Sequence, residues 1–331
     1  MKKTRVIAIL FVTAICLGLI TGCGAQQKEK VVIYTAATTT RMEDLLGKMQ
    51  EKFPDYEIVV EYISTSKLAA RLLAEGSDSG CDIIHDLSYT YLDQLEAAGV
   101  LAPLDWVDYS LFTDDVVTSD HYVIECRTAG AIVVNTEMLD KLGLEEPSSY
   151  DDLLKPEYKG LVVMADPKAS GTGYMFLKSL VNAKGEEAAF DYFERLSGNI
   201  LQFYSSGNGI LNALIQEEAA IAFSMTNTAA LAIAEGDPLK ILIFEEGSPY
   251  TMYGQSIVNG KESRQCVKEV FDYMIGELLE YSIANYVPEK IYKDKDFTTE
   301  DYPQNIIYSD MSGDTIEEKE RLLDMWVIPA E

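Results

Sequence analysis

The sequence predicts an α/β protein that is divided into two lobes. Segments with a strand pattern alternate along the chain with segments of helical periodicity, which is typical of sheets covered by helices. The chain has 331 residues, of which 47% are apolar. Because single cores stop growing near ~250–300 residues, a chain of this length is expected to form two packed bodies.

The clearest alternation lies in the first half of the chain. The β-branched run Val31–Tyr34 predicts a strand, and 42–53 carries apolar residues at helical spacing until Pro54 interrupts it. A second strand is predicted at 56–63, where polar and apolar residues alternate, and a second helix at 67–75. The remaining elements of this half are strands predicted at 82–84 and 129–135 and helices predicted at 91–98 and 137–142.

The second half continues with short apolar strands and amphipathic helices. Val162–Ala165 predicts a strand that ends at the turn Asp166-Pro167. The same patterns predict further strands at 241–244 and 255–258 and helices at 175–182, 186–196, 210–216, 229–235, 268–279 and 317–326.

The N-terminal residues have the pattern of a secretory signal. Basic residues precede an apolar run at 6–20 of about 15 residues, shorter than the roughly 20 that a ~30 Å hydrocarbon core requires. The sequence Ile20-Thr21-Gly22-Cys23 then resembles the lipobox of bacterial lipoproteins. That resemblance implies a signal at 1–22, lipidation of Cys23 as a membrane anchor, and a polar tether at 23–30. An ordinary signal peptide with an incidental cysteine is the alternative.

The charge balance excludes some partners. The chain has 54 acidic and 27 basic residues, and its net charge of −27 becomes −30 without the three basic residues of the signal. We therefore expect no binding of nucleic acid or of an anionic lipid surface by charge.

Few residues suit metal or thiol chemistry. Cys81, Cys126 and Cys266 permit at most one disulfide, and the chain has only two histidines, His85 and His121. We therefore expect no metal site, no cofactor and no histidine-dependent catalysis.

One sequence pattern recurs where predicted helices begin. Hydroxyl residues and glycines precede or open the helix at 38–40, 64–66, 170–173, 205–209 and 226–228. Such residues can simply cap a helix, but helix N-termini also bind anions. Because strand-to-helix loops of an α/β lobe open on one sheet edge, several of these loops are expected to converge on one crevice. The cations beside them, which could assist, are Arg41, Lys67 and Lys168.

Four stretches, taken in their order along the chain, resemble a known family. They are Ser66-Lys-Leu-Ala-Ala-Arg-Leu-Leu-Ala-Glu75, Gly130-Ala-Ile-Val-Val-Asn-Thr136, Asp166-Pro-Lys-Ala-Ser-Gly-Thr-Gly-Tyr174 and Phe244-Glu-Glu-Gly-Ser-Pro-Tyr250. With the lipobox, they resemble the substrate-binding lipoproteins of ATP-binding cassette (ABC) importers, in the group that binds ferric iron, phosphonates and sugar phosphates.

The resemblance implies a type II periplasmic-binding-protein fold, in which each lobe is a mixed sheet flanked by helices and the ligand cleft lies between the lobes. Lobe 1 would comprise 31–127 and 247–331, lobe 2 would comprise 128–246, and the hinge would lie near Arg127 and Glu246. The family implies no catalysis, a small solute and importer permease subunits as partners. A monomer is expected.

The hydroxyl loops predict a small anionic organic solute that bears a phosphate or phosphonate. The residues expected to hold its anionic group are Ser66, Ser170, Gly171, Thr172, Ser206 and Asn208. The residues expected to contact the remainder, such as an amine or hydroxyl, are Thr38, Thr39, Asp86, Asn227 and Glu245.

Three alternatives remain at this point. Ferric-iron members carry adjacent tyrosines after a segment like 219–223, whereas 224–229 has none here, so iron would need another set such as His85, Asp86 and Tyr89. A hydrolase using Ser170 or Ser206 lacks the GxSxG pattern. A sensor for a membrane histidine kinase would share the same lobes and site.

Overall fold

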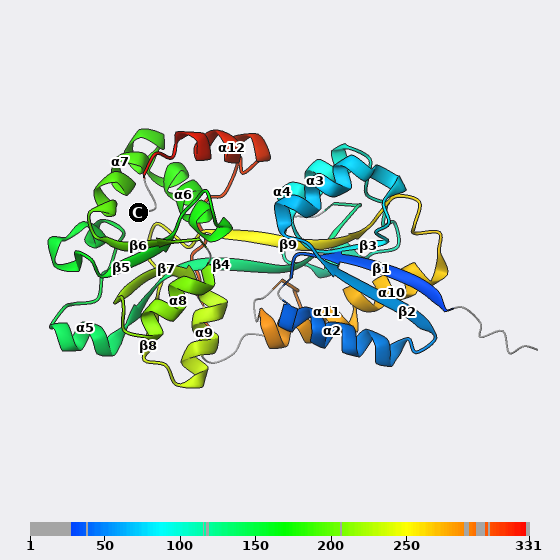
Figure 1. The fold of residues 1–331 in the computed structure, drawn as a ribbon, viewed down its shortest axis with the longest axis horizontal. Coiled ribbons are helices and arrows are strands. Elements are labelled where there is room, and N and C mark those ends of the chain that lie inside the picture. Colours follow the sequence, from blue (N-terminus) through cyan, green and yellow to red (C-terminus); the bar gives the residue numbers. More distant parts are fainter. Residues whose placement is uncertain are drawn as a thin grey trace, which may run out of the picture.

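The computed structural model describes residues 28–328 except 38, 115, 117–118, 206, 288–290, 296–301 and 304. The predicted signal at 1–22, Cys23 and most of the tether lie outside the described residues, as do Thr38, Ser206 and the side chain of Asn208. Two lobes lie side by side and are joined by long strands (Figure 1). The predicted α/β class and two-lobed architecture are confirmed.

The first lobe is built around parallel strands from the N-terminal part of the chain. β1 pairs in parallel with β2 and β3, and β3 pairs antiparallel with β9. Its strands are β1 (Glu29–Thr35), β2 (Tyr56–Tyr62), β3 (Ile83–Ser88) and β9 (Tyr250–Ile257). Its helices are α2 (Thr39–Lys52), α3 (Thr65–Glu75), α4 (Tyr89–Ala97), α10 (Gln265–Ile275) and α11 (Glu277–Tyr286).

The second lobe holds the middle of the chain. β7 lies between β4 and β5, and β6 forms the edge beyond β5. The strands are β4 (Val123–Asn135), β5 (Val162–Ala165), β6 (Ile200–Tyr204), β7 (Ile221–Met225) and β8 (Leu239–Leu242). The helices are α5 (Thr136–Leu142), α6 (Gly171–Lys184), α7 (Glu186–Ser197), α8 (Gly207–Ile215), α9 (Thr226–Glu235) and α12 (Ile316–Met325). Short 3₁₀ turns occupy Gly76–Asp78, Tyr109–Leu111, Asp151–Leu154 and Pro156–Tyr158.

The long strand β4 belongs to both lobes. Its first part, up to Ala129, pairs with β9, and its second part, from Gly130, pairs with β7 and then β8. All of its residues are buried. A Cβ on Gly130 would lie 2.8 Å from the Phe176 ring and 3.0 Å from Pro249, so only glycine permits the close packing at this crossing.

Two further segments accompany β4 between the lobes. The chain returns through 244–250, and Ser248 pairs in parallel with Tyr308 on a third segment. The guanidinium of Arg127 lies 3.9 Å from the centroid of the Tyr308 ring and 5.7 Å from that of Tyr250. Backbone pairing and aromatic contacts therefore tie the three crossings together.

Each lobe has its own apolar core. In the first lobe the core lies between the sheet and its helices and includes Ile33, Leu72 and Val270. In the second lobe one cluster lies under α6 and α7, and another lies under α8 and α9 on the opposite face of the sheet. Helices thus cover both faces of the sheet, as the strand–helix alternation predicted.

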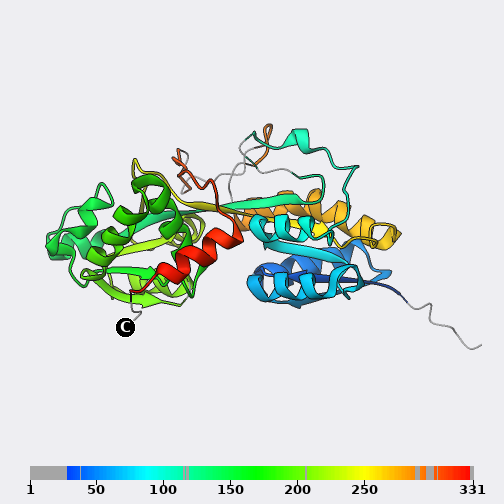
Figure 2. The same cartoon turned by 90° about the horizontal axis from the view of Figure 1, so that it is seen from above.

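The C-terminal helix corrects one predicted boundary. We assigned 247–331 to the first lobe, but α12 lies beside α6 on the second lobe, at the side nearest the first (Figures 1 and 2). The physical reason is aromatic packing: Trp326 is 1% exposed, and its ring centroid lies 5.3 Å from that of Phe193. Leu322 enters the same core.

Two other expectations differ from the structure. The helix predicted at 268–279 is two helices, because α10 ends at Ile275 and α11 begins at Glu277 with Gly276 between them. Strands β6 and β7 were not predicted, since short apolar runs lack a decisive periodicity.

The three cysteines that follow the signal and lipobox, Cys81, Cys126 and Cys266, are buried, and none of them is in a disulfide. The disulfide that the sequence permitted is therefore not formed. Among the described residues, no helix combines the length and the apolar character needed to cross a membrane.

We expect Trp326→Ala to lower the free energy of unfolding by about 3–5 kcal/mol, because it leaves a cavity under α12. The neighbouring Val327 is 83% exposed, so Val327→Ala is a matched control that should change the free energy of unfolding by less than about 0.5 kcal/mol. Urea unfolding of both variants measures the difference, and equal effects would contradict the docking of α12 on the second lobe.

Candidate functional site

A cavity of about 490 Å³ lies between the lobes. The first lobe lines it with the starts of α3 and α4 and with β9, and the second lobe lines it with the loop before α6 and with α12. The lining residues are Ser64, Thr65, Ser66, Ser88, Thr90, Tyr91, Pro167, Lys168, Ala169, Ser170, Gly171, Thr172, Tyr174, Met175, Met225, Thr251, Tyr253, Asp314, Ile316, Lys319, Glu320 and Leu323.

The N-termini of α3, α4 and α6 open into this cavity, and they differ in how they are capped. Ser170 accepts a hydrogen bond from the backbone N–H of Thr172 at 3.2 Å and caps α6. Ser64 and Ser88 make no such bond at the starts of α3 and α4. Capping therefore explains the hydroxyl residue at α6 alone, and the hydroxyls at α3 and α4 can serve a ligand.

The start of α6 is held close to the end of β5. The side chain of Asp166 accepts a hydrogen bond from the N–H of Lys168 at 2.9 Å, and its carbonyl accepts one from Ser170 at 2.9 Å. A Cβ on Gly173 would lie 2.3 Å from the carbonyl oxygen of Ala165, so glycine is required here. A Cβ on Gly171 would meet open space. The helix start is thus fixed against the sheet while Gly171 faces the cavity.

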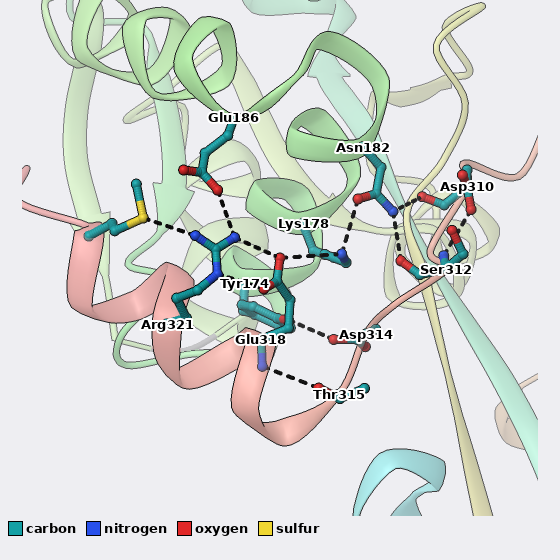
Figure 3. A network of polar contacts seen from close by, with 11 residues as sticks. Tyr174, Lys178, Asn182, Glu186, Asp310, Ser312, Asp314, Thr315, Glu318 and Arg321 are labelled. Atoms are coloured by element: carbon teal, nitrogen blue, oxygen red, sulfur yellow. Dashed lines mark hydrogen bonds and ion pairs between the residues drawn. The ribbon is translucent and has the colours of Figure 1, made fainter.

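The C-terminal segment forms a further wall and is anchored on α6 and α7 (Figure 3). The amide of Asn182 donates to the carbonyls of Asp310 and Ser312 at 2.9 and 3.0 Å. Arg321 of α12 pairs with Glu186 of α7 at 2.6 Å. The Tyr174 hydroxyl donates to Asp314 at 2.6 Å. These contacts place the first turn of α12 at the cavity.

Two ionisable groups on this wall carry shifted pKa values. Burial raises the pKa of Asp314, although the hydrogen bond from Tyr174 opposes the shift. Burial lowers the pKa of Lys319, although the charge of Asp314 opposes the shift. The Lys319 ammonium lies 5.7 Å from the centroid of the Tyr91 ring and 5.1 Å from that of Tyr174.

Four predicted site residues meet in the cavity: Ser66, Ser170, Gly171 and Thr172. Gly207 brings the start of α8 near them, because its Cβ would lie 2.9 Å from the hydroxyl oxygen of Thr172.

Four other predicted residues do not line this cavity: Thr39, Asp86, Asn227 and Glu245. Thr39 lines a separate hollow between α2 and β2, and Glu245 is exposed on the return crossing. Asn227 is half-buried in the first turn of α9.

Sequence reasoning missed the start of α4 and all of α12. The hydroxyl pattern could have identified α4, because Ser88 and Thr90 follow β3 as other hydroxyls follow other strands. Nothing in the sequence could have identified Asp314 and Lys319, since their position depends on how α12 packs.

Asp86 and Arg41 belong to a buried network of the first lobe. Arg41 is 7% exposed and bonds Asp86 at 2.9 Å, Glu125 at 2.9 Å and Ser282 at 3.1 Å. Asp86 has a φ of +57° where β3 is irregularly paired with β9. Burial raises the pKa of Asp86 to about 6, although Arg41 opposes the shift. Arg41 therefore acts on the lobe's interior rather than on the cavity.

His85 completes this network as a neutral ring. Its Nδ1 lies 2.9 Å from the hydroxyl of Thr35, and its Nε2 lies 3.1 Å from Glu125. Burial, aided by the charge of Arg41, lowers the pKa of His85 to about 3. The Thr35 hydroxyl accepts the N–H of Ala37 and can donate to Nδ1, which assigns the ring proton to Nε2, on the side that faces Glu125.

The network contains side chains that could act as metal ligands. Asp86, Glu125 and Cys126 offer ligand atoms within 4.8 Å of one another. Both carboxylates already bond the guanidinium of Arg41. The positive charge that these carboxylates require is thus supplied by the chain itself.

His85 should make stability depend on pH. In the unfolded chain His85 binds a proton near its ordinary pKa of about 6.5, whereas in the folded protein it binds one only when the pH falls to about 3. The contribution of neutral His85 to the free energy of unfolding is therefore lost as the pH falls through that window. Relative to His85→Asn, the wild type should lose about 2 kcal/mol more of unfolding free energy between pH 7.5 and pH 5.

Urea unfolding at both pH values measures this difference. Asp86 is present in both proteins, so its own titration largely cancels in the comparison. His121, whose side chain is 34% exposed, supplies the matched control His121→Asn. An equal change of pH dependence in both variants would contradict the buried neutral state of His85.

Comparison with known proteins agrees with this geometry. A model of the family of bacterial extracellular solute-binding proteins matches residues 79–294. A Haemophilus influenzae protein without an assigned function is 28% identical over 287 residues, covering 84% of this chain and 82% of that protein. The spermidine/putrescine-binding periplasmic protein of Escherichia coli is 25% identical over 246 residues, covering 70% of this chain and 67% of that protein.

A solved structure shares the fold. The periplasmic binding protein AfuA of Actinobacillus pleuropneumoniae, solved with fructose-6-phosphate, has a TM-score of 0.74 at 24% identity and covers 91% of this chain and 98% of its own. Because the family model matches more than half of the chain, the chain belongs to the bacterial extracellular solute-binding proteins, which bind solutes for transport and are not enzymes.

Proposed function

We propose that this protein captures a small anionic organic solute that bears a phosphate or phosphonate, and that it delivers the solute to an ABC importer. The observation that carries the proposal is the convergence of three helix N-termini, those of α3, α4 and α6, on one cavity between the lobes. Helix N-termini present unpaired N–H groups and a partial positive charge, which suits an anion.

The magnitudes agree with this proposal. Each helix end contributes about 0.3–1 kcal/mol to the binding free energy of a nearby anion, and each hydrogen bond to a charged group contributes about 1.5–3 kcal/mol. Micromolar affinity requires about 8 kcal/mol. Four or five contacts from Ser66, Ser88, Thr90, Ser170 and Thr172 therefore suffice without a cluster of arginines, even after ordering costs.

The opposite side of the cavity suits a polar remainder. Asp314 and Glu320 offer carboxylates, and Tyr91 and Tyr253 offer hydroxyls and ring faces. An amine or a sugar hydroxyl on the solute would meet these groups. Two similar proteins support this reading, because AfuA was solved with fructose-6-phosphate and the Escherichia coli relative is named for the amines spermidine and putrescine.

Ferric iron fits this cavity less well. Iron-binding tyrosines act as phenolates, whereas burial raises the pKa of Tyr91, Tyr174 and Tyr253 and so makes their ionisation more costly. His85 and Asp86, the alternative ligands, are engaged with Glu125 and Arg41.

Isothermal titration with 2-aminoethylphosphonate, glucose 6-phosphate, phosphoglycerate and ferric citrate tests the proposal. We expect micromolar binding of at least one phosphorus compound. Ser66→Ala should weaken it roughly 10-fold or more, because a hydrogen bond to a charged group is lost. Ser263→Ala, on an exposed turn of the first lobe, is the matched control. A visible charge-transfer band with ferric citrate, without binding of any phosphorus compound, would reject the proposal in favour of iron.

The lipid anchor on Cys23 would hold the binding protein near its permease and raise its effective concentration there. We expect Cys23→Ser to appear in the medium, to bind solute as the wild type does and to support poor uptake. Fractionation and solute titration measure the two effects. Loss of solute binding in Cys23→Ser would show that the function depends on the N-terminal segment instead of the cavity.

A further inference from the structure

The ammonium of Lys319 stands between the first turns of two helices from opposite lobes. Tyr91 lies in the first turn of α4, Tyr174 lies in the first turn of α6, and the Lys319 Nζ lies within 6 Å of both ring centroids (5.7 and 5.1 Å). The lysine itself comes from the first turn of α12. Three elements that are distant in the sequence thus bring positive charge to one place in the cavity.

Lys319 differs from the buried lysine of the same wall. Lys178 is 3% exposed, bonds the amide of Asn182 at 3.0 Å and lies 3.8 Å from Glu318. For half-buried Lys319, the part of the chain that the structure describes records contacts with two aromatic rings and an electrostatic interaction with Asp314, but no direct ion pair. Asp314, which already accepts a hydrogen bond from Tyr174, offsets the desolvation of this charge only in part, and two positive helix ends nearby increase the cost.

We infer that Lys319 is a ligand-binding residue of the cavity and that it pairs with the anionic group of the solute. This inference rests on the proposed function and adds a residue outside the hydroxyl loops on which that function was argued. An anion between the starts of α4 and α6 supplies the direct ion pair that Lys319 lacks. Tyr91 and Tyr174 hold the ammonium in place for it by cation–π contact.

The arrangement links solute binding to the C-terminal segment. α12 is fixed to the second lobe through Arg321 and Trp326, while Tyr91 belongs to the first lobe. An anion that binds Lys319 and the start of α4 therefore contacts both lobes at once. Such a contact stabilises the arrangement in which the lobes approach each other, because the affinity is highest when both sets of contacts are made.

The test compares Lys319→Gln, Lys319→Arg and Lys240→Gln by titration with 2-aminoethylphosphonate and glucose 6-phosphate. Lys240 pairs with Glu146 on the exposed surface of the second lobe, so Lys240→Gln removes the same charge outside the cavity. We expect Lys319→Gln to weaken binding roughly 10- to 100-fold, Lys319→Arg to retain most of the affinity, and Lys240→Gln to change it less than about 3-fold.

Salt dependence separates charge pairing from a structural role. The wild-type affinity should fall as sodium chloride rises, and Lys319→Gln should show a smaller fall, because its charge pair is absent. Melting of the solute-free variants checks that each is folded at the titration temperature.

The outcomes separate the inference from the proposed function. If the wild type binds neither compound, the proposed function fails for these solutes and the inference falls with it. If the wild type binds and Lys319→Gln binds equally well, the inference alone is wrong. Equal losses in Lys319→Gln and Lys319→Arg would assign Lys319 a packing role and would also overturn the inference.

Discussion

The satisfied backbone of β4 is the constraint on which the rest of this structure depends. The strand is buried throughout, so its N–H and C=O groups must find partners in both lobes. It finds them in β9 on one side of Gly130 and in β7 and β8 on the other. The two lobes are therefore parts of one hydrogen-bonded sheet system, and the space between them is bounded by elements whose starting points the sheet defines.

The position of the polar cavity follows from this sheet system. α3, α4 and α6 begin where strands or the loops after them end, so their N-termini face the same gap. No arginine is among the described residues that line this cavity, and Arg41, which follows the hydroxyl loop at 38–40 in the sequence, is engaged elsewhere. Arg41 neutralises Asp86 and Glu125 inside the first lobe, where His85 stays uncharged. Among the described lining residues, the groups that favour an anion are the helix ends and the lysines Lys168 and Lys319, within a chain whose overall charge is strongly negative.

The C-terminal helix shows why packing has to be known before the site is complete. Its residues were predicted to be helical, and they are, as Ile316–Met325. Its lobe was predicted wrongly, because helical periodicity identifies an apolar face without naming the surface that covers it. The surface is the aromatic cluster around Phe193 on the second lobe, reached through a third crossing that the sequence pattern does not mark. Asp314 and Lys319 enter the cavity as a consequence.

The sequence by itself determined the α/β class, most strands and helices, the two lobes and the hydroxyl loops that supply Ser66, Ser170, Gly171 and Thr172. These features depend on local periodicity, turn residues and chain length, which are readable along the chain. Only the tertiary structure decided that Asp86 bonds Arg41, that α4 joins the cavity, and that Lys319 reaches it. Those outcomes depend on long-range packing and on competition between partners for buried charges, which neither spacing nor composition records.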